Sequence, residues 1–414
     1  MTAPPRFLDE RKSLACIHCG LCLGACPTYL QTGNENESPR GRIYIMRALQ
    51  AGRLPLDDES VRHIDLCLGC RACEVACPSG VQYGALLEQT RDFIEEHHRR
   101  SPYQTALRRF VIERIFPVPW RMKFALVPAR VAKALRLDRV LPVALRESLS
   151  LVPSNLDSTP LPEFSPAETQ PAKGTVGFVR GCVMSVMFGD TNAASVRLLN
   201  EAGFDVIVPP SQECCGALFA HSGRLKLARD YALRNIDAFA EHQVDAILIN
   251  AAGCGSTLKE YGHLLADSEH HEAAENFSRK VRDLTEFLVE HGFARRAFKP
   301  WNGRVTYHDA CHLAHPQRIT RPPRKLVRAV AGANYVELPE SDVCCGSAGT
   351  YNLTEPQMAE ALQRRKIENI LRTGASTVVT TNPGCILQIR AGLEKAAPGK
   401  FRILHIADFL AESL

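Results

Sequence analysis

The sequence predicts two kinds of structure in one chain. A mainly helical, cysteine-rich module comes first, and two repeated α/β domains with parallel sheet character follow it. Three observations support this mixed α+β and α/β fold class. A cysteine run occurs twice within the first 78 residues, and a different cysteine set occurs twice in the C-terminal half, about 130 residues apart. Strand-like and helix-like segments alternate between the cysteines of the second set, which is typical of βαβ units with right-handed crossovers.

The N-terminal run has the spacing C-x2-C-x2-C-x3-C followed by proline, and the second run repeats it. This spacing is typical of chains that bind two [4Fe–4S] clusters, in which three thiolates bind one cluster and the fourth binds the other. We therefore expect crossed ligation. The predicted ligands of the first cluster are Cys16, Cys19, Cys22 and Cys77. Those of the second cluster are Cys67, Cys70, Cys73 and Cys26.

Zinc and disulfides are the two alternatives for this run. Structural zinc sites use two separated C-x2-C pairs and require neither a third cysteine at the same interval nor a Cys-Pro ending. Disulfide frameworks suit short secreted chains, whereas this chain has 414 residues and a polar beginning that does not read as a secretory leader. The sixteen cysteines are therefore interpreted as metal ligands in a reducing compartment, and we expect a cytoplasmic protein.

The cysteine-rich module is predicted to occupy residues 1–100, with helices over 41–50 and 86–100. A change of composition follows. Residues 101–150 contain ten Arg or Lys against three acids, mixed with apolar residues and prolines, and the Pro-, Ser- and Thr-rich residues 151–173 read as a linker. A basic, apolar stretch of this kind can lie on the inner, anionic face of a membrane; the alternative is short helices packed against a neighbouring domain or partner.

Bulk properties limit the other partners. No apolar run is long enough to cross a bilayer. The net charge of +5 is modest, and basic residues are not interleaved with aromatic ones as in nucleic-acid-binding proteins. We therefore expect no nucleic acid partner.

The two C-terminal domains are expected over residues 174–303 and 304–414. In each, one cysteine precedes a Cys-Cys-Gly triplet and another follows it: Cys182, Cys214, Cys215 and Cys254 in repeat 1, and Cys311, Cys344, Cys345 and Cys385 in repeat 2. Strand-like segments such as TVGFVRG, DVIVPP, AILINAAG, RVTYHDA, YVELPE and STVVTTNPG precede these cysteines. The carboxyl ends of parallel strands meet at one edge of a sheet, so the four thiols of each repeat should converge. They form a candidate further metal site, for one additional iron–sulfur cluster per repeat or a shared one. The alternative is reduced, packed or redox-active thiols without metal.

The Cys-Cys-Gly triplet, its lead of 32 or 33 residues from the first cysteine, and its duplication resemble the cysteine-rich domains of the heterodisulfide reductase family. With the N-terminal module, nearly the whole chain resembles the iron–sulfur subunits of bacterial glycolate oxidases. The supporting motifs are CIHCGLCLGACP, CLGCRACEVACP, QECCG, VCCGSAG and NPGC, together with ESPRGRIYIM, AAGCGS and HDACHLAH. This resemblance implies a separate flavin subunit that oxidises a 2-hydroxy acid, and a respiratory acceptor, with quinone expected.

One departure from the heterodisulfide reductase pattern concerns the end of each repeat. That pattern closes with C-x2-C, but the first of these positions is Ala251 in repeat 1 and Asn382 in repeat 2. Each repeat then offers four thiols instead of five, which argues against a five-ligand noncubane cluster. His308, His312 and His315 surround Cys311 and are candidate ligands or proton carriers, although such histidines are commonly only hydrogen-bonded.

The chain itself is expected to be an electron carrier without catalytic residues. It shows no hydrolase triad, phosphate-binding loop, dinucleotide fingerprint or flavin site. Oxidation of an alcohol removes two electrons, whereas each cluster moves one, so a flavin on another subunit must split the pair. Three alternatives remain at this stage: an iron–sulfur subunit for glycerol-3-phosphate or lactate dehydrogenase, a disulfide reductase acting through the repeats, and a zinc-stabilised scaffold.

Overall fold

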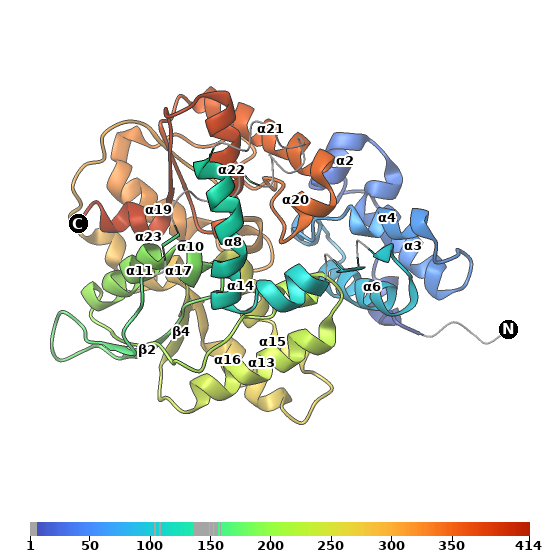
Figure 1. Ribbon diagram of the computed structural model, residues 1–414, viewed down its shortest axis with the longest axis horizontal. Helices are drawn as coiled ribbons and strands as arrows, with labels where there is room; N and C mark the ends of the chain where they lie inside the picture. The colour runs from blue at the N-terminus through green and yellow to red at the C-terminus, as the bar shows by residue number, and fades with distance from the viewer. Residues whose placement is uncertain are drawn as a thin grey trace.

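The computed structural model describes residues 6–102, 105–106, 109–135, 149, 152, 156–157 and 159–414. The cysteine-rich module forms one end of the molecule, in blue, and the two α/β repeats form the larger part (Figure 1). The domain boundaries expected from the sequence remain a prediction. The described strands all lie between residues 164 and 405, which does not fix where one domain ends and the next begins.

The N-terminal module is helical, as predicted. Its helices are α1 (Glu10–Leu14), α2 (Pro27–Thr32), α3 (Pro39–Gln50), α4 (Asp58–Asp65), α5 (Ala72–Val75) and α6 (Tyr83–His97). The proline that closes the first motif starts a helix: Pro27 is the first residue of α2, directly after Cys26, because proline lacks only a donor that is unpaired there anyway. Ser38 caps α3 through the Gly41 amide. The cysteine runs thus lie in loops and short helices held by well-capped neighbours.

The basic stretch forms a π-helix, η2 (Arg109–Ile115), and α8 (Pro119–Ala134). Helix α8 lies across repeat 1 and contacts α10 (Met184–Met187). Its inner side packs Met122 against Cys182 and Cys214. The remainder of the stretch, mainly 136–148, is outside the described residues. Part of the predicted linker adds β1 (Phe164–Ser165) to the edge of the first sheet.

Repeat 1 contains a five-stranded sheet in the order β1-β3-β2-β4-β5. Its strands after β1 are β2 (Thr175–Val179), β3 (Asp205–Ile207), β4 (Ala246–Ile249) and β5 (Val281–Asp283), and all pairs except β1 with β3 are parallel. Its helices after α10 are α11 (Gly189–Glu201), α12 (Ala217–His221), α13 (Leu225–Ala240), α14 (Ala252–Leu258), α15 (Tyr261–Leu264), α16 (His271–Lys280) and α17 (Leu284–Glu290). The predicted strand–helix alternation is confirmed here.

Repeat 2 has three parallel strands in the order β6-β7-β8: β6 (Val305–Tyr307), β7 (Thr377–Thr380) and β8 (Arg402–His405). Its helices are α18 (Cys311–Ala314), α19 (Arg321–Ala331), α20 (Tyr351–Thr354), α21 (Pro356–Thr373), α22 (Pro383–Ala396) and α23 (Ile406–Ala411). The strand expected over YVELPE is wrong, since only Tyr335 bridges to Val305. Pro339 has no amide to donate, and Glu340 turns the chain with φ 50°.

The two repeats pack with their strand ends facing each other. The Ala252 amide at the end of β4 donates to the Thr381 carbonyl oxygen at the end of β7 (3.2 Å), and His405 Nε2 donates to the Asn250 carbonyl oxygen (2.8 Å). Apolar residues from both repeats form common core clusters. The carboxyl edges that carry the cysteines are therefore buried next to each other.

Candidate iron–sulfur sites

A cavity in the N-terminal module collects the four cysteines predicted to bind the second cluster. Its lining includes Cys26, Cys67, Cys70 and Cys73. Three of these thiols come from the second run, and Cys26 reaches them from the first run as the residue before α2. All four are buried. This is the arrangement that crossed ligation requires.

The spacing of these thiols can be tested against the size of a metal group. Zn–S bonds of about 2.3 Å in a tetrahedron place sulfurs about 3.8 Å apart. Within the described residues 6–102, no three cysteine sulfurs lie within 4.8 Å of one another. Sulfurs spread around a cavity fit a polynuclear cluster better than a single ion. Burial raises the pKa of the Cys70 and Cys73 thiols well above their usual value, so metal binding at this site must release protons.

Hydrogen bonds to sulfur come from the cavity wall. Tyr83 Oη donates to Cys67 Sγ (3.6 Å), and the Gly69 amide donates to the same sulfur (3.4 Å). Donors aimed at ligand sulfur are among the features that set the reduction potential of a cluster. The sequence motifs do not indicate Tyr83, because it follows the second run on α6 and only the fold turns it back.

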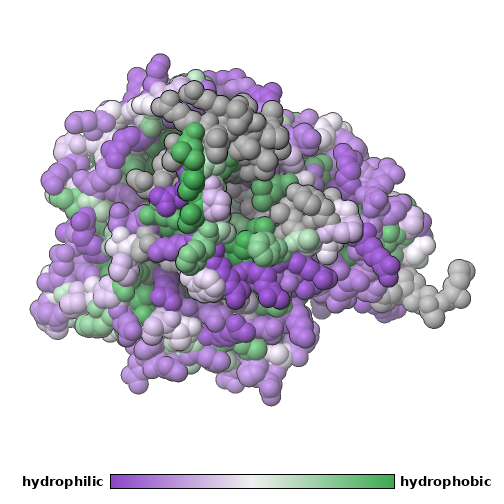
Figure 2. Space-filling model, in the orientation of Figure 1, coloured by the Kyte–Doolittle hydropathy of each residue, from purple (hydrophilic) through white to green (hydrophobic). Residues whose placement is uncertain are grey.

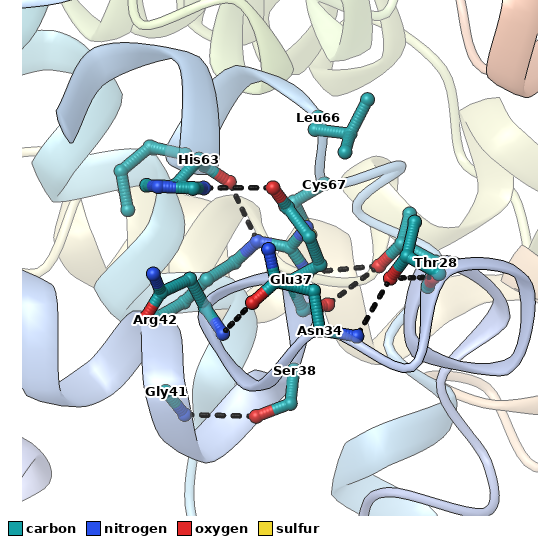
Figure 3. A network of polar contacts seen from close by, with 12 residues as sticks. Thr28, Asn34, Glu37, Ser38, Gly41, Arg42, His63, Leu66 and Cys67 are labelled. Atoms are coloured by element: carbon teal, nitrogen blue, oxygen red, sulfur yellow. Dashed lines mark hydrogen bonds and ion pairs between the residues drawn. The ribbon is translucent and has the colours of Figure 1, made fainter. Parts of the chain in front are cut away.

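A buried polar network joins Thr28, Arg42 and His63 (Figure 3), and Cys26 lies next to it. Arg42 is fully buried and donates through Nη2 to Glu37 Oε2 (2.8 Å), through Nη1 to Thr28 Oγ1 (3.1 Å) and through Nε to the His63 carbonyl oxygen (2.7 Å). Thr28 Oγ1 lies 3.3 Å from Cys26 Sγ. The arginine thus ties α2, α3 and α4 together around the crossed ligand.

The cysteines predicted to bind the first cluster lie nearer the surface. Cys16, Cys22 and Cys77 are half-buried and pack against one apolar cluster, and Cys19 is exposed. Ile17 and Leu21 beside them are 68% and 62% exposed. The two predicted cluster sites therefore differ in access: one faces solvent and the other faces the interior.

Each repeat brings its four thiols into a row. Cys182 Sγ lies 3.6 Å from Cys214 Sγ, and the neighbouring thiols of Cys215 and Cys254 are among the groups that shift the pKa values of Cys214 and Cys215. Repeat 2 has the same row, from Cys311 through Cys344 and Cys345 to Cys385.

Backbone geometry explains the glycine of each triplet. Gly346 has φ +89°, and a Cβ there would lie 2.5 Å from the Ala359 carbonyl oxygen; Gly216, with φ +81°, approaches Ala228 in the same way. Only glycine combines this conformation with so close a contact.

The second cluster site adjoins the thiol row of repeat 2. Cys70 and Cys344 belong to one apolar cluster, with Cys311 packed against it. Burial and then the Cys311 thiol are the leading causes that raise the pKa of Cys70. Two hydrogen bonds hold the contact: Tyr351 Oη donates to the Leu66 carbonyl oxygen (2.7 Å), and His312 Nε2 donates to that of Gly69 (3.1 Å).

The three histidines near Cys311 have different roles. His312 is used in the contact with Gly69, and His315 Nε2 donates to the Asp342 carbonyl oxygen (3.1 Å). His308 is fully buried and neither ring nitrogen has a hydrogen-bond partner among the described residues. Sequence reasoning missed Lys366, a buried lysine of α21 that donates to the carbonyl oxygens of Glu340 and Ser341.

Family comparisons agree with this geometry. The 4Fe-4S dicluster domain family matches residues 12–81, and the cysteine-rich domain family matches residues 176–259 and 305–390. The chain is 41% identical to the probable glycolate oxidase iron-sulfur subunit of Bacillus subtilis, with 98% of this chain and 95% of that protein covered. It belongs to the glycolate oxidase iron–sulfur subunit family. The Escherichia coli glycolate oxidase iron-sulfur subunit is 33% identical, over 97% of this chain and 94% of its own length.

Two further proteins are similar to this glycolate oxidase-type subunit, one in sequence and one in fold. A fumarate reductase (CoM/CoB) subunit of Methanothermobacter marburgensis is 28% identical, over 98% of this chain and 73% of its own length. A hypothetical protein from Helicobacter pylori has a related fold in its crystal structure, with a TM-score of 0.55 at 9% identity, covering 98% of this chain and 73% of that one.

The predicted family, the two-cluster N-terminal module and the duplicated cysteine-rich domains are thus confirmed. The chain is an iron–sulfur electron-transfer subunit, and the zinc-scaffold alternative for its N-terminal module is not supported. None of the described helices is long and apolar enough to span a membrane.

Proposed function

We propose that this subunit carries single electrons from a flavin subunit that oxidises glycolate, or a related 2-hydroxy acid, to a quinone. One observation carries the proposal: sulfur sites form a continuous series from the exposed Cys19, through the buried second cavity, to the thiol row of repeat 2. The names of two relatives that match nearly the full length support the substrate, and the need to split an electron pair supports the flavin partner.

The flavin subunit is proposed to dock at the first cluster site. Exposed apolar side chains are grouped in the sequence around these cysteines: Leu14 is 54%, Ile17 68% and Leu21 62% exposed. Apolar groups at the centre of a surface patch favour association with another protein. A partner seated there would bring its flavin next to the accessible cluster, whereas the second cluster is shielded by α2, α3 and repeat 2.

The ligand sets follow the crossed pattern in this proposal. Cys16, Cys19, Cys22 and Cys77 hold one [4Fe–4S] cluster, and Cys67, Cys70, Cys73 and Cys26 hold the other. Such clusters supply one-electron redox chemistry when bound. The chain's own residues position the ligands and exclude water: Arg42 fixes the helix that carries Cys26, and Tyr83 donates to Cys67.

Contact with a membrane is proposed for α8. Its outward side chains form a stripe at helical spacing, with exposed fractions of 58% for Trp120, 71% for Phe124, 45% for Val127, 50% for Val131 and 65% for the adjoining Leu135. The helix contains four basic residues and no acid. Figure 2 shows apolar side chains along α8 in the middle of this face. A cationic helix with an apolar stripe and a tryptophan suits an anionic lipid surface.

This placement would put the cytoplasmic face of a membrane over repeat 1. Met122 on the inner side of α8 packs with Cys182 and Cys214, so lipid-dissolved quinone would approach the thiol row of repeat 1. This row would receive electrons from the row of repeat 2, since Cys215, Cys345 and Cys385 belong to one buried cluster. Only α8 would separate the lipid from these thiols, and we therefore place the proposed quinone site there.

A second candidate changes the hydroxy acid. Lactate utilization protein A of Oceanobacillus iheyensis is 29% identical over 55% of this chain and 93% of its own length. Since this chain has no described substrate site, the flavin subunit decides between glycolate, lactate and glycerol 3-phosphate. The disulfide reductase alternative finds less support, because Asn382, in the place of a fifth thiol, accepts from the Gly253 amide and donates to Cys385 Sγ.

The test is anaerobic co-purification with the flavin subunit, followed by addition of each hydroxy acid and a quinone analogue. We expect glycolate to bleach the cluster absorbance and to reduce the quinone, and Cys70→Ser to abolish quinone reduction while a dye still accepts electrons from the flavin. Cluster bleaching by lactate alone would contradict the substrate. Unchanged quinone reduction in Cys70→Ser would contradict the route.

A further inference from the structure

The thiol row of repeat 2 contains one more donor than the row of repeat 1. His308, at the end of β6, has a ring nitrogen that lies with Cys345 Sγ and Cys385 Sγ in a group whose atoms are all within 4.8 Å of one another. Among the described residues, this is the only such group of three or more histidine, cysteine or acidic side chains. All three residues are buried.

Among the described residues, His308 makes no hydrogen bond of good geometry, although the backbone of Ser341 lies near its ring. Its exposed fraction is 0%, and neither Nδ1 nor Nε2 has a hydrogen-bond partner. A buried imidazole without partners costs stability, because the ring loses its water without gaining another contact. An unpaired nitrogen directed at two thiols is what a metal ligand would show before the metal is bound.

Repeat 1 is an internal control for this arrangement. The position three residues before the first cysteine is His308 in repeat 2 and Val179 in repeat 1. A second difference lies on the helix that contacts the triplet glycine. Seven residues after the contacting alanine, repeat 2 has Lys366 and repeat 1 has Asn235. Both repeats therefore have the same frame of four thiols, but only repeat 2 adds an imidazole and a buried ammonium group to it.

The five donors of repeat 2 are too spread out for one ion. A tetrahedral ion would draw its ligands to about 3.8 Å from one another, but only His308, Cys345 and Cys385 form a compact group, and the row continues through Cys344 to Cys311. Cys311 at the far end adjoins Cys70 of the second cluster site. A polynuclear centre can use all five donors, and its position next to Cys70 gives it an electron donor.

We propose that His308 is a metal ligand of an iron–sulfur centre in repeat 2, completing with its imidazole the set of Cys311, Cys344, Cys345 and Cys385. The histidine takes the part of the fifth thiol that Asn382 does not supply. Asn382 instead donates to Cys385 Sγ (3.7 Å), in the outer layer around the ligands. The inference deepens the proposed function by adding a third redox site to the electron route.

Nitrogen ligation can be measured without turnover. The full chain is produced with 15N-histidine, loaded with iron and sulfide anaerobically, and examined by pulsed electron paramagnetic resonance during a redox titration. We expect one centre with strong 15N coupling, about twelve iron atoms per chain, and loss of about four iron atoms and of the coupling in His308→Val. His308→Cys should keep the iron, lose the coupling and shift the potential downward, because histidine ligands raise it.

Two controls protect this result from a folding artefact. Val is the repeat-1 residue at this place, and His405→Val changes an equally buried histidine whose ring bonds to Asn250 and Ala407 instead of facing cysteines; folded His405→Val should keep the coupling. Only about eight iron atoms in the wild type, zinc in repeat 2, or a coupling that survives in His308→Val would each overturn the proposal. None of these outcomes depends on the hydroxy acid or the quinone, so the proposed function is tested separately.

Discussion

Repeats 1 and 2 have the same four-thiol frame and different surroundings. Repeat 1 places Val179, Val183 and Val186 where repeat 2 places His308, His312 and His315. Its thiols lie under α8, whereas those of repeat 2 adjoin the second cluster site. The duplication therefore preserved the backbone that converges the cysteines, and the side chains around it diverged. In the proposed electron route, the position of each repeat, more than the motif itself, gives it its part.

The largest expected difference concerns the thiols next to the N-terminal module. Cys344→Ser should remove about four iron atoms per chain and abolish quinone reduction, because it interrupts the row that starts at Cys70. Cys214→Ser, the matched change in repeat 1, should leave that iron in place. Iron and sulfide analysis of both variants, with a quinone assay in the complex, measures this. Equal iron loss in the two variants would remove the distinction between the repeats.

Lys366 gives a stability difference of intermediate size. Lys366→Met leaves the carbonyl oxygens of Glu340 and Ser341 without their buried donor, which should lower the free energy of unfolding by about 2–4 kcal/mol. Asn235→Leu in repeat 1 removes a neutral amide that donates to the carbonyl oxygens of Cys214 and Tyr231 and accepts from the Glu213 amide. It should cost about 1–3 kcal/mol, because hydrogen bonds of neutral groups are weaker than those of a charged donor. Denaturant unfolding of the two variants compares them. A larger loss in Asn235→Leu would reverse the order.

Membrane binding should depend on the surface over repeat 1 alone. Phe124→Asp should weaken binding to vesicles of anionic phospholipid roughly tenfold or more, since a buried phenylalanine side chain contributes about 1.5–3 kcal/mol. Leu371→Asp alters an apolar residue of repeat 2 that is 43% exposed and should have no effect. Vesicle sedimentation at low and high salt measures both. Equal binding by the wild type and Phe124→Asp would contradict the role of α8.

The smallest expected effect is a pH dependence of opposite sign in the two repeats. Asp283 and His405 both end an outer strand and accept the backbone amide two residues ahead. Burial raises the pKa of Asp283 to about 6 and lowers the pKa of His405 to about 4. Folded Asp283 holds its proton more tightly than the unfolded chain, so its contribution to stability is lost as pH rises from about 3.8 to 6. The contribution of His405 is lost as pH falls from about 6.5 to 4.

Substitution separates these two terms. Between pH 6 and 5, His405→Asn should lessen the acid loss of stability by about 1 kcal/mol, and Asp283→Asn should increase it by a similar amount. Thermal unfolding at several pH values, compared with the wild type to cancel the acid lability of the clusters, measures both. Changes of the same sign in the two variants would contradict the assignment.

Local spacing predicted the parts of the molecule that depend on neighbours in sequence. The two cysteine runs indicated a two-cluster module, and the helices predicted over 41–50 and 86–100 correspond to α3 and α6 to within a few residues. The expected strand over YVELPE failed because Pro339 and the left-handed Glu340 end the pairing after a single bridge. The apolar residues of this segment predicted a strand, and the prediction did not take into account that Pro339 and Glu340 would end the pairing.

The sequence did not give the partners of other site residues. Arg42 follows the first run and could be read as a donor to cluster sulfurs or as a solvated surface residue, yet it is the fully buried centre of the network around Cys26. Lys366 lies in an amphipathic helix, α21, among the residues of its buried face. A lysine at an otherwise apolar position was the only sign in the sequence that it has a buried role. Both need long-range packing to acquire their partners, because the groups they bind are backbone carbonyls and side chains from other elements.

The order of residues along the chain was enough to determine the metal chemistry, since ligand spacing within a short loop controls which thiolates can reach one cluster. It also determined the duplication and the parallel sheets, which follow from local pattern. The tertiary structure alone decided which set of cysteines is shielded, which repeat has thiols next to it and which described histidine has no hydrogen-bond partner. These depend on contacts between residues such as Cys70 and Cys311, more than two hundred positions apart, and only the packed fold brings such groups together.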